Sequence, residues 1–294
     1  MMRKMLVSLL AAMLLLAVSM PAHGELHVNE EPPEDWSERE LFRLVVIDVE
    51  RSDAMLLQCG GENMLVDAGI GTRRDKLYEA LDSRGVTHFK YLFSTHSDND
   101  HIQGFRYLIQ SGNYEADMFT SPNPVDYEDG PGFHAPVARA VRKAQIPYHV
   151  IEEGEQLTLG GASMTVMRCM RGWGRNARSA TLMITFGECR VFLTGDINDQ
   201  AMAEYIEKYG EEALQADVLK APHHGLTHLP EDFLAAVDPS LLFITNLAQN
   251  TSKFRYKMEN VYPDIAVLCS GDAEIVLETD GVDWYVWQEL EQAE

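Results

Sequence analysis

The feature that most constrains this chain is a dense group of ionisable side chains directly after a short apolar segment. Residues 90–94 (KYLFS) have the composition of a buried strand, and His96, Asp98, Asp100 and His101 follow it at once. A tight loop after a strand lets alternating side chains converge on one point, and nitrogen and oxygen donors suit divalent metal ions. The spacing H-x-D-x-D-H therefore predicts a metal site rather than a polar surface loop.

Apolar patterning predicts strands and helices in alternation along the rest of the chain. Strands are expected at residues 41–49, 54–59, 64–66, 91–93, 118–119, 148–151, 156–159, 164–167, 180–186, 190–193, 218–219 and 241–245, and near 266, 275 and 285. Helices are expected at residues 73–83, 102–109, 134–144, 200–209, 231–237 and 253–259. Residues 121–133 are rich in proline and glycine, which predicts a loop. The pattern indicates an α/β fold in which two mixed sheets pack face to face and helices flank them.

Two further polar motifs stand at the ends of predicted strands. Asp196 ends the motif TGD after residues 190–193, and His223 and His224 lie in KAPHHG after residues 218–219. We expect these side chains to gather with the first group at one edge of the sheets. A carboxylate between two cations holds both while a bridging water loses a proton, and this role suits Asp196.

In combination, these motifs resemble the metallo-β-lactamase superfamily, and specifically the hydrolase domain of the competence protein ComEC. The resemblance extends from residue 41 to residue 287 and rests on VIDVERSDAMLLQ, VDAG, STHSDNDHIQG, NARSATLMITFG, FLTGD and LKAPHHG, in the family's order. It implies a four-layer αββα sandwich and a hydrolase with metal-bound hydroxide as the nucleophile. It also implies the metal ligands, which are His96 and Asp98 at one position, Asp100 and His101 at a second, Asp196 between them, and His224.

His224 is preferred to His223 as the last ligand because the imidazole before the glycine matches the family's closing histidine. Asp100 and His223 are the expected catalytic groups, which would manage protons. Zn²⁺ or Mn²⁺ is the expected cofactor, with one or two ions per chain, because Asp98 adds an oxygen donor where many members have histidine. No histidine before Asp196 matches the family's third motif, so one metal position is expected to be weak or empty.

Substrate contacts are expected from the densest group of arginines, at positions 168, 171, 175 and 178. Arg175 and Arg178 are candidates for binding a phosphate, and Lys220 for stabilising developing charge. Solvated surface arginines and a strand-end lysine are the alternative. Residues 48–54 (DVERSDA) lack the glycines of the family's opening motif DVGQGDA, which predicts altered access to the metal edge.

The resemblance to ComEC predicts a phosphodiesterase or nuclease-like enzyme. The chain without residues 1–24 carries 22 basic and 46 acidic groups, a net charge of −24. This charge repels long nucleic acid, so a small phosphodiester or a phosphocholine-type ester is a rival to DNA as the substrate. The alternatives are a lactonase or β-lactamase-type carbonyl hydrolase, and a non-catalytic binding protein that keeps the fold.

The N-terminal sequence predicts export. Arg3 and Lys4 precede an apolar run at residues 5–18, and small residues stand before position 25, as in a secretory signal peptide at residues 1–24. An uncleaved anchor is the alternative. A periplasmic or secreted protein without a membrane span is expected after cleavage, with residues 25–40 as a flexible lead-in and one domain at 41–294. In that compartment the four cysteines are expected either to form one or two disulfides or to be buried free thiols.

Overall fold

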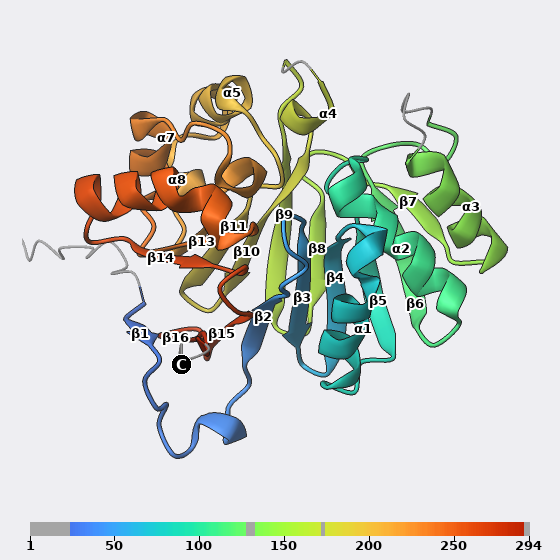
Figure 1. Cartoon of the computed structure of the whole chain (residues 1–294), viewed down its shortest axis with the longest axis horizontal. Helices are drawn as coiled ribbons and strands as arrows, with labels where there is room; N and C mark the ends of the chain where they lie inside the picture. Colours follow the sequence, from blue (N-terminus) through green and yellow to red (C-terminus); the bar gives the residue numbers. More distant parts are fainter. Residues whose placement is uncertain (1–23, 128–132, 172–173, 291–294) are drawn as a thin grey trace, which may run out of the picture.

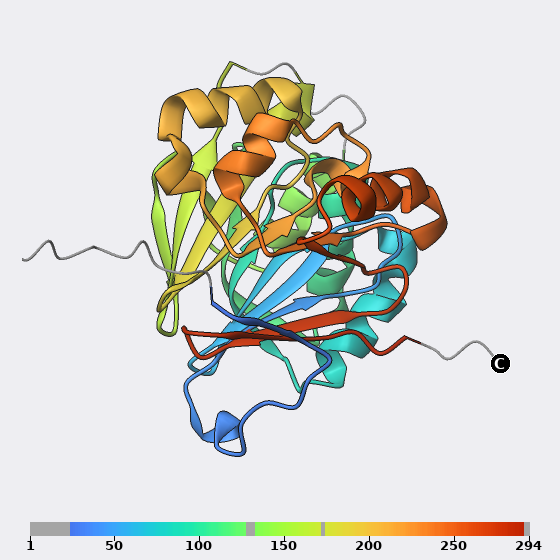
Figure 2. The same ribbon diagram turned by 90° about the vertical axis from the view of Figure 1, so that its left-hand side faces the viewer.

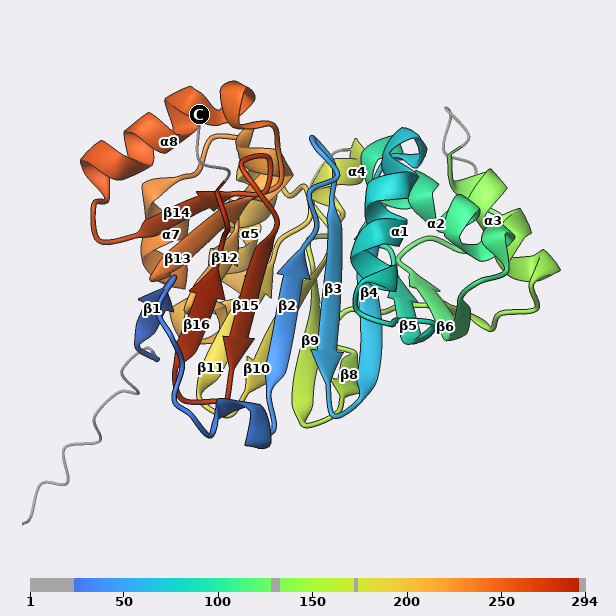
Figure 3. The same cartoon turned by 60° about the horizontal axis from the view of Figure 1, so that its bottom comes forward.

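The computed structural model describes residues 24–127, 133–171 and 174–290. Its strands form a nine-stranded sheet with the order β1-β16-β15-β2-β3-β4-β5-β6-β7 and a seven-stranded sheet with the order β14-β13-β12-β11-β10-β9-β8. The two sheets face each other, and helices cover both outer surfaces (Figures 1 and 3). The predicted α/β fold of two mixed sheets flanked by helices is confirmed. The predicted signal peptide lies almost wholly outside the described residues.

The nine-stranded sheet is antiparallel from β16 to β4 and parallel from β4 to β7. Its strands are β1 (Leu26–Val28), β2 (Phe42–Val46), β3 (Ala54–Cys59), β4 (Glu62–Ala68), β5 (His88–Phe93), β6 (Glu115–Ser121), β7 (Tyr148–Val150), β15 (Ile275–Thr279) and β16 (Trp284–Trp287).

The seven-stranded sheet is antiparallel from β8 to β11 and parallel from β11 to β14. Its strands are β8 (Gln156–Leu159), β9 (Ala162–Arg168), β10 (Ala180–Phe186), β11 (Cys189–Leu193), β12 (Val218–Lys220), β13 (Leu241–Ile244) and β14 (Ala266–Cys269). Each sheet thus has a parallel part, and parallel strands bring their carboxyl ends to a common edge.

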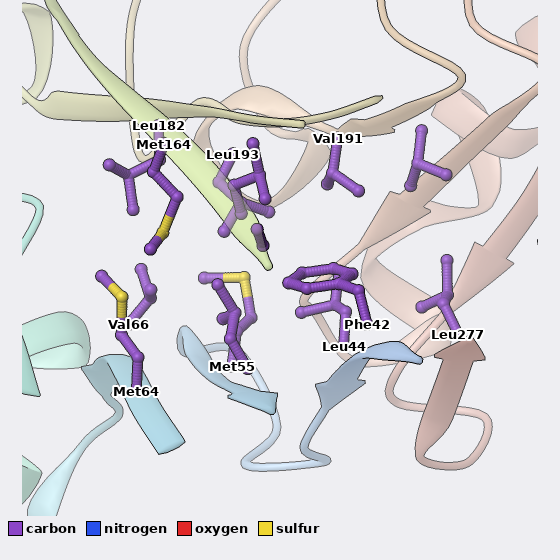
Figure 4. Close-up of a cluster of buried hydrophobic side chains, with 14 of the residues drawn as sticks. Phe42, Leu44, Met55, Met64, Val66, Met164, Leu182, Val191, Leu193 and Leu277 are labelled. Carbon is purple, nitrogen blue, oxygen red and sulfur yellow. The ribbon is translucent and has the colours of Figure 1, made fainter. Parts of the chain in front are cut away.

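The main core lies between the sheets, and strand alternation explains its composition. In β2, Phe42, Leu44 and Val46 point into this layer, whereas Val45 packs on the helix side. The opposed side chains of the two sheets in Figure 4 include Phe42, Leu44, Met55, Met64 and Val66 on one side and Met164, Leu182, Val191 and Leu193 on the other. Because helices cover the outer faces, the central strands are apolar on both faces.

Helices α1 (Arg74–Asp82), α2 (Asn99–Ser111) and α3 (His134–Lys143) pack on the outer face of the nine-stranded sheet. Helices α5 (Asp199–Tyr209), α6 (Glu211–Leu214), α7 (Glu231–Val237) and α8 (Ala248–Val261) pack on the other sheet. The short helix α4 (Gly174–Ala177) and the 3-10 turns η1 (Trp36–Glu38), η2 (Gly71–Arg73) and η3 (Pro222–Gly225) complete the described elements. No described helix combines the length and the apolar character that a membrane crossing requires.

Gly104 brings α2 into direct contact with the end of β4. Its backbone N–H donates to the carbonyl of Gly69 at 2.9 Å, and a Cβ at position 104 would lie 1.8 Å from the carbonyl oxygen of Ala68. No side chain fits in this contact. Glycine therefore sets the depth at which the first turn of α2, which carries Asp100 and His101, approaches the sheet.

The segment at residues 25–40, predicted as a flexible lead-in, is instead packed against the nine-stranded sheet. β1 pairs in parallel with β16, and Figure 2 shows the two strands side by side. Trp36 is buried; its ring meets that of Tyr285 at 4.6 Å, and its Nε1 donates to Glu278 at 2.9 Å. The acidic composition of the segment predicted disorder, but one large aromatic anchor and a three-residue strand attach it to the fold.

Of the alternatives for the cysteines, the structure shows the free thiols. Cys59, Cys169, Cys189 and Cys269 are all described, all buried and all unbridged. Cys169 lies 2.6 Å from a carboxylate oxygen of Glu204, so this thiol serves as a hydrogen-bond donor. Burial raises the pKa of Cys189 to about 12, which keeps this thiol protonated at neutral pH.

Candidate metal centre

A buried aspartate at the end of β4 holds the loop that follows β5. Asp67 accepts hydrogen bonds from the backbone N–H of Thr95 at 2.9 Å, from its hydroxyl at 2.6 Å and from Nδ1 of His101 at 2.8 Å. The Thr95 hydroxyl therefore accepts from Nδ1 of His96, 3.0 Å away. Burial raises the pKa of the Asp67 carboxyl, and the charge of His101 opposes this rise. These contacts orient both rings through Nδ1, so that each Nε2 faces the carboxylate of Asp196.

The helix after this loop starts earlier than predicted. α2 begins at Asn99 rather than at residue 102, so Asp100 and His101 lie in its first turn. The backbone N–H of Asp53 donates to the carbonyl of Asp100 at 3.0 Å and fastens this turn to the segment before β3. His101 is fully buried as a result, whereas Asp100 remains partly exposed.

Asp196, which follows β11, stands at the centre of the imidazoles. Its Oδ2 lies 3.2 Å from Nε2 of His101, 3.6 Å from Nε2 of His224, and 3.8 Å from Nε2 of both His96 and His223. All of these side chains except His223 are at most 2 % exposed. Three motifs that are far apart in the sequence thus meet at one rim of the sandwich, as the metal prediction requires.

Asp53, a residue that the sequence did not single out, lies beneath the imidazoles and is fully buried. Its Oδ1 lies 3.1 Å from Nδ1 of His224 and accepts a hydrogen bond from the Thr245 hydroxyl at 2.5 Å. Its Oδ2 lies 2.9 Å from Nζ of Lys220 and 3.5 Å from Nδ1 of His101. Asp53 faces the outward nitrogens of two rings, so it orients them as a carboxylate behind a metal-ligating histidine does.

Several polar atoms that face the centre of this cluster lack protein partners. His96 Nε2 and Asp196 Oδ1 are buried and have no hydrogen-bond partner among the described residues. The Nε2 atoms of His101 and His224 lie only 3.2 Å apart. Asp53, His101, Asp196 and His224 each have a potential ligand atom within 4.8 Å of the others, although Asp53 lies on the Nδ1 side of the rings and pairs with Lys220. A divalent cation would accept the unshared electron pairs of such atoms, so the residues present fit a metal ion.

The charges in the cluster lead to the same conclusion. Burial alone would lower the pKa of His224, but Asp196 and Asp53 outweigh it and raise the pKa to about 9. The same carboxylates raise the pKa of His101 well above its usual value, again against burial. Burial, helped by the charge of His101, lowers the pKa of His96 to about 3. Protons on His101 and His224 thus neutralise the buried carboxylates, and a divalent cation would take their place.

Asp98 and Asp100 border the cluster and are partly exposed. Asp100 Oδ2 lies 3.5 Å from Nε2 of His224; burial would raise the pKa of Asp100, but the histidines outweigh it and lower the pKa to about 2. The two carboxylate oxygens of Asp98 have different partners: Oδ1 lies 2.6 Å from Nε of Arg175, and Oδ2 lies 3.8 Å from Nε2 of His96. Asp98 is therefore shared between an arginine and the metal cluster.

Among the described residues, no third-motif histidine reaches the side of the cluster that holds His96. His134 contacts a backbone carbonyl 3.0 Å away, and His149 contacts a glutamate carboxylate 2.6 Å away. In the connection from β9 to β10, the Ser179 hydroxyl instead accepts from the backbone N–H of Asp196 at 3.3 Å. Within the described residues, the imidazoles around Asp196 all come from the motifs that the sequence singled out.

The two adjacent histidines after β12 have opposite surroundings. His223 and His224 have φ values of +50° and +56°, the left-handed conformation that non-glycine residues rarely adopt. His224 is buried with Nε2 toward Asp196, whereas the His223 side chain is 36 % exposed and its Nδ1 lies 3.0 Å from the Thr227 hydroxyl. The structure thus places His224 inside the cluster and His223 at its mouth.

Lys220 does not lie where a substrate-binding side chain would. It is fully buried, and its Nζ donates to the carbonyls of Gly195 at 2.9 Å and Ala221 at 3.2 Å as well as pairing with Asp53. The prediction that Lys220 stabilises charge on the substrate requires an accessible ammonium group, but β12 lies between two parallel neighbours and its end is covered. Lys220 therefore ties the loop of Asp196 to the loop of His223 and His224 from below.

The other two residues predicted to bind substrate lie at the surface beside the cluster. Arg175 and Arg178 line a cavity of about 460 Å³ that also reaches His96. Arg168, from the end of β9, lines the same cavity, whereas Arg171 is not among its lining residues. The arginine group thus divides into three cavity residues and one residue that pairs with Glu207 at 2.7 Å.

The fold and the cluster together define a class of protein. It is a four-layer sandwich in which loops after parallel strands deliver histidine and aspartate side chains to one rim, where they can hold a metal ion. Comparison with known proteins agrees with this description. The family model described as the metallo-beta-lactamase superfamily matches residues 47–242.

The chain belongs to the metallo-β-lactamase superfamily, whose members are mostly metal-dependent hydrolases. Among solved structures, it is similar to the metallo-β-lactamase fold protein YhfI from Bacillus subtilis, with 15 % identity over 81 % of this chain and 100 % of that one, at a TM-score of 0.55. A variant of the β-hydroxylase CmlA is 13 % identical over 85 % of this chain and 55 % of its own length, at a TM-score of 0.53. These likenesses concern the fold. The search of curated proteins finds no match.

Proposed function

We propose that this protein is a metal-dependent phosphodiesterase of the ComEC-like type that acts on a small substrate. The observation that carries the proposal is the convergence of three buried Nε2 atoms, from His96, His101 and His224, on Asp196. The motif order in the sequence supports the ComEC-like subgroup, and the N-terminal sequence supports export to the periplasm or beyond. A net charge of −24 without residues 1–24 favours a small substrate over long nucleic acid.

His101, His224, Asp196 and Asp100 would hold one ion, either Zn²⁺ or Mn²⁺. When bound, this ion supplies a Lewis acid that activates water and polarises a phosphoryl oxygen. The opposite side of the cluster offers His96 and part of Asp98 but no third imidazole. We therefore propose one tightly held ion and a second position that is weak.

One side chain of the chain itself, His223, is placed to handle protons. Burial lowers the pKa of His223, so its ring is neutral near pH 7, and Nε2 faces the cluster 3.8 Å from Asp196. This nitrogen can accept a proton at the mouth of the site and pass it to solvent. Asp100, with a pKa of about 2, stays ionised and accepts hydrogen bonds rather than donating a proton.

The test is a substrate panel on purified protein loaded with Zn²⁺ or Mn²⁺. Hydrolysis of bis-p-nitrophenyl phosphate, with little activity toward p-nitrophenyl phosphate or a simple lactone, supports the proposal. Lactone hydrolysis without phosphodiester hydrolysis would assign carbonyl chemistry instead. Metal uptake without any hydrolysis would favour a binding protein. Metal analysis by mass spectrometry should give about one equivalent per chain, since one complete set of ligands is present.

Asp100→Ala tests the role of the partly exposed carboxylate. We expect turnover to fall at least about 100-fold while the melting temperature stays nearly unchanged, because the side chain lies at the edge of the core. Asp75→Ala is the matched control, since Asp75 also lies in the first turn of a helix but is exposed on α1. Full activity of the Asp100→Ala protein would reject the catalytic assignment.

A further inference from the structure

The cavity beside the metal cluster has a charge opposite to that of the protein as a whole. The chain carries 46 acidic against 24 basic groups. Yet the described residues that line this cavity include three arginines, Arg168, Arg175 and Arg178, and no carboxylate. Such a local reversal of charge is a feature of sites that bind anions.

Arg168 lines the cavity and is partly buried. Its Nη1 donates to the carbonyl of Ile151 at 3.3 Å, and its Nε is buried without a hydrogen-bond partner among the described residues. Burial lowers the pKa of Arg168, and the nearby charge of Arg178 contributes. The neighbouring carboxylate of Glu153 is bound to Lys208 and Tyr209 and does not pair with this guanidinium. A buried guanidinium N–H without a partner is costly unless an acceptor such as an anion joins it.

The arrangement of the cavity relates it to the proposed reaction. His96 belongs both to the cavity wall and to the imidazoles around Asp196, so a molecule bound here would touch both sites. Tyr127, Pro122 and other apolar groups form part of the wall. A volume of about 460 Å³ accommodates one small polar group with an attached ring or chain, and not a nucleic acid duplex.

We propose that this cavity binds a terminal phosphate group of the substrate. On this inference, which rests on the proposed function, the substrate is a small phosphodiester with a second, phosphomonoester group. Guanidinium forks from Arg168 and Arg178 hold the oxygens of that group, and Arg175 contributes charge while it pairs with Asp98. A phosphate is favoured over a carboxylate because it offers more oxygens and nearly two negative charges to several arginines.

Binding of methyl phosphate to the purified metal-containing protein tests the site without catalysis. We expect isothermal titration calorimetry to show binding that weakens at least about tenfold in Arg168→Gln and in Arg178→Gln, since each substitution removes a charged donor. Arg171→Gln is the matched control: it belongs to the same arginine group but pairs with Glu207 outside the cavity, and it should bind like the wild type. Arg168→Lys should give an intermediate affinity, since it keeps the charge but loses the fork.

Several results would overturn the inference. One is that methyl phosphate does not bind to the wild type. Another is that Arg171→Gln weakens the binding of methyl phosphate as much as Arg168→Gln does. Binding that neither Arg168→Gln nor Arg178→Gln changes would place the phosphate on the metal ion instead. Acetate that binds as tightly as methyl phosphate would assign the cavity to a carboxylate. Circular dichroism of each variant shows whether it is folded.

A pair of substrates separates this inference from the proposed function. Thymidylyl-thymidine with a 5′-phosphate should have at least a tenfold lower KM than the same dinucleotide without it, and Arg168→Gln should remove this difference. Hydrolysis of both dinucleotides with equal KM would refute the phosphate site and leave the phosphodiesterase proposal standing. Binding of methyl phosphate without hydrolysis of either dinucleotide would refute the phosphodiesterase proposal and leave the phosphate site standing.

Discussion

Lys220→Met should destabilise the protein strongly, although the lysine touches neither solvent nor the centre of the metal cluster. The ammonium group is fully buried, pairs with Asp53 at 2.9 Å, and donates to the carbonyls of Gly195 and Ala221. Methionine has a similar length and no charge. The substitution leaves the Asp53 carboxylate without its main partner and leaves two backbone carbonyls without this donor.

The size of the effect follows from the burial of both partners. Removal of one member of a buried ion pair costs about 3–5 kcal/mol, because the remaining charge stays buried and uncompensated. For a chain of this size, about 2 °C of melting temperature is lost per kcal/mol, which gives a decrease of roughly 6–10 °C. Metal affinity should fall as well, because Lys220 joins the loops that carry Asp196 and His224.

Thermal unfolding followed by circular dichroism, together with metal analysis, measures both effects. Lys208→Met is the matched control, since Lys208 forms an ion pair with Glu153 at the surface, where such pairs contribute at most about 1 kcal/mol. The double variant Asp53→Leu/Lys220→Met removes both charges and should recover much of the stability without recovering metal affinity. Equal melting temperatures for Lys220→Met and Lys208→Met would refute the argument that the buried pair supports the site.

Three further predictions concern the metal cluster. Arg175→Gln frees the Asp98 carboxylate, and metal analysis at saturating Zn²⁺ should then show more bound metal than the roughly one equivalent of the wild type; unchanged stoichiometry would contradict this. Gly104→Ala should lower both the melting temperature and the metal content, because the added Cβ would lie 1.8 Å from a backbone oxygen of β4. Gly112→Ala is the control: nothing lies within 4 Å of a Cβ there, so the metal content should not change. Metal affinity should fall with decreasing pH. His224 has a pKa of about 9, so it is protonated at pH 7 in the metal-free protein and must lose this proton when the metal binds. Each proton that the metal displaces changes the metal affinity about tenfold per pH unit. Competition with a chelator at pH 6, 7 and 8 measures this slope, and a constant affinity would show that no imidazole proton is displaced.

The main features of the site were predictable because its residues follow parallel strands. His96 and His101 follow β5, Asp196 follows β11, and His224 follows β12, and each position was visible as polar residues directly after an apolar segment. Parallel strands in each sheet end at a common edge, so their terminal loops meet. The same logic predicted the two-sheet fold, whose core strands are apolar on both faces.

The residues that support the site were not predictable in the same way. Asp53 and Asp67 lie within motifs that carried the family resemblance, but nothing in those segments shows that one carboxylate orients His224 and the other His101. Those roles depend on the register of β4 with β5 and on the position of α2. Lys220 was predicted to stabilise charge on the substrate, with an ordinary strand-end lysine as the alternative. Its burial could not be read from the sequence, because it depends on the packing of both neighbouring strands around β12.

The pairing of β1 with β16 has a consequence for how the protein behaves when it is shortened. β1 covers the outer side of β16 and is itself only three residues long, with Glu25 and Glu30 beside it. Short, charged edges resist addition of foreign strands, whereas a longer bare edge invites it. A shortened chain that starts at Leu41, where the family motifs begin, would leave the backbone groups of β16 open to other molecules, and such a fragment should be prone to self-association in solution.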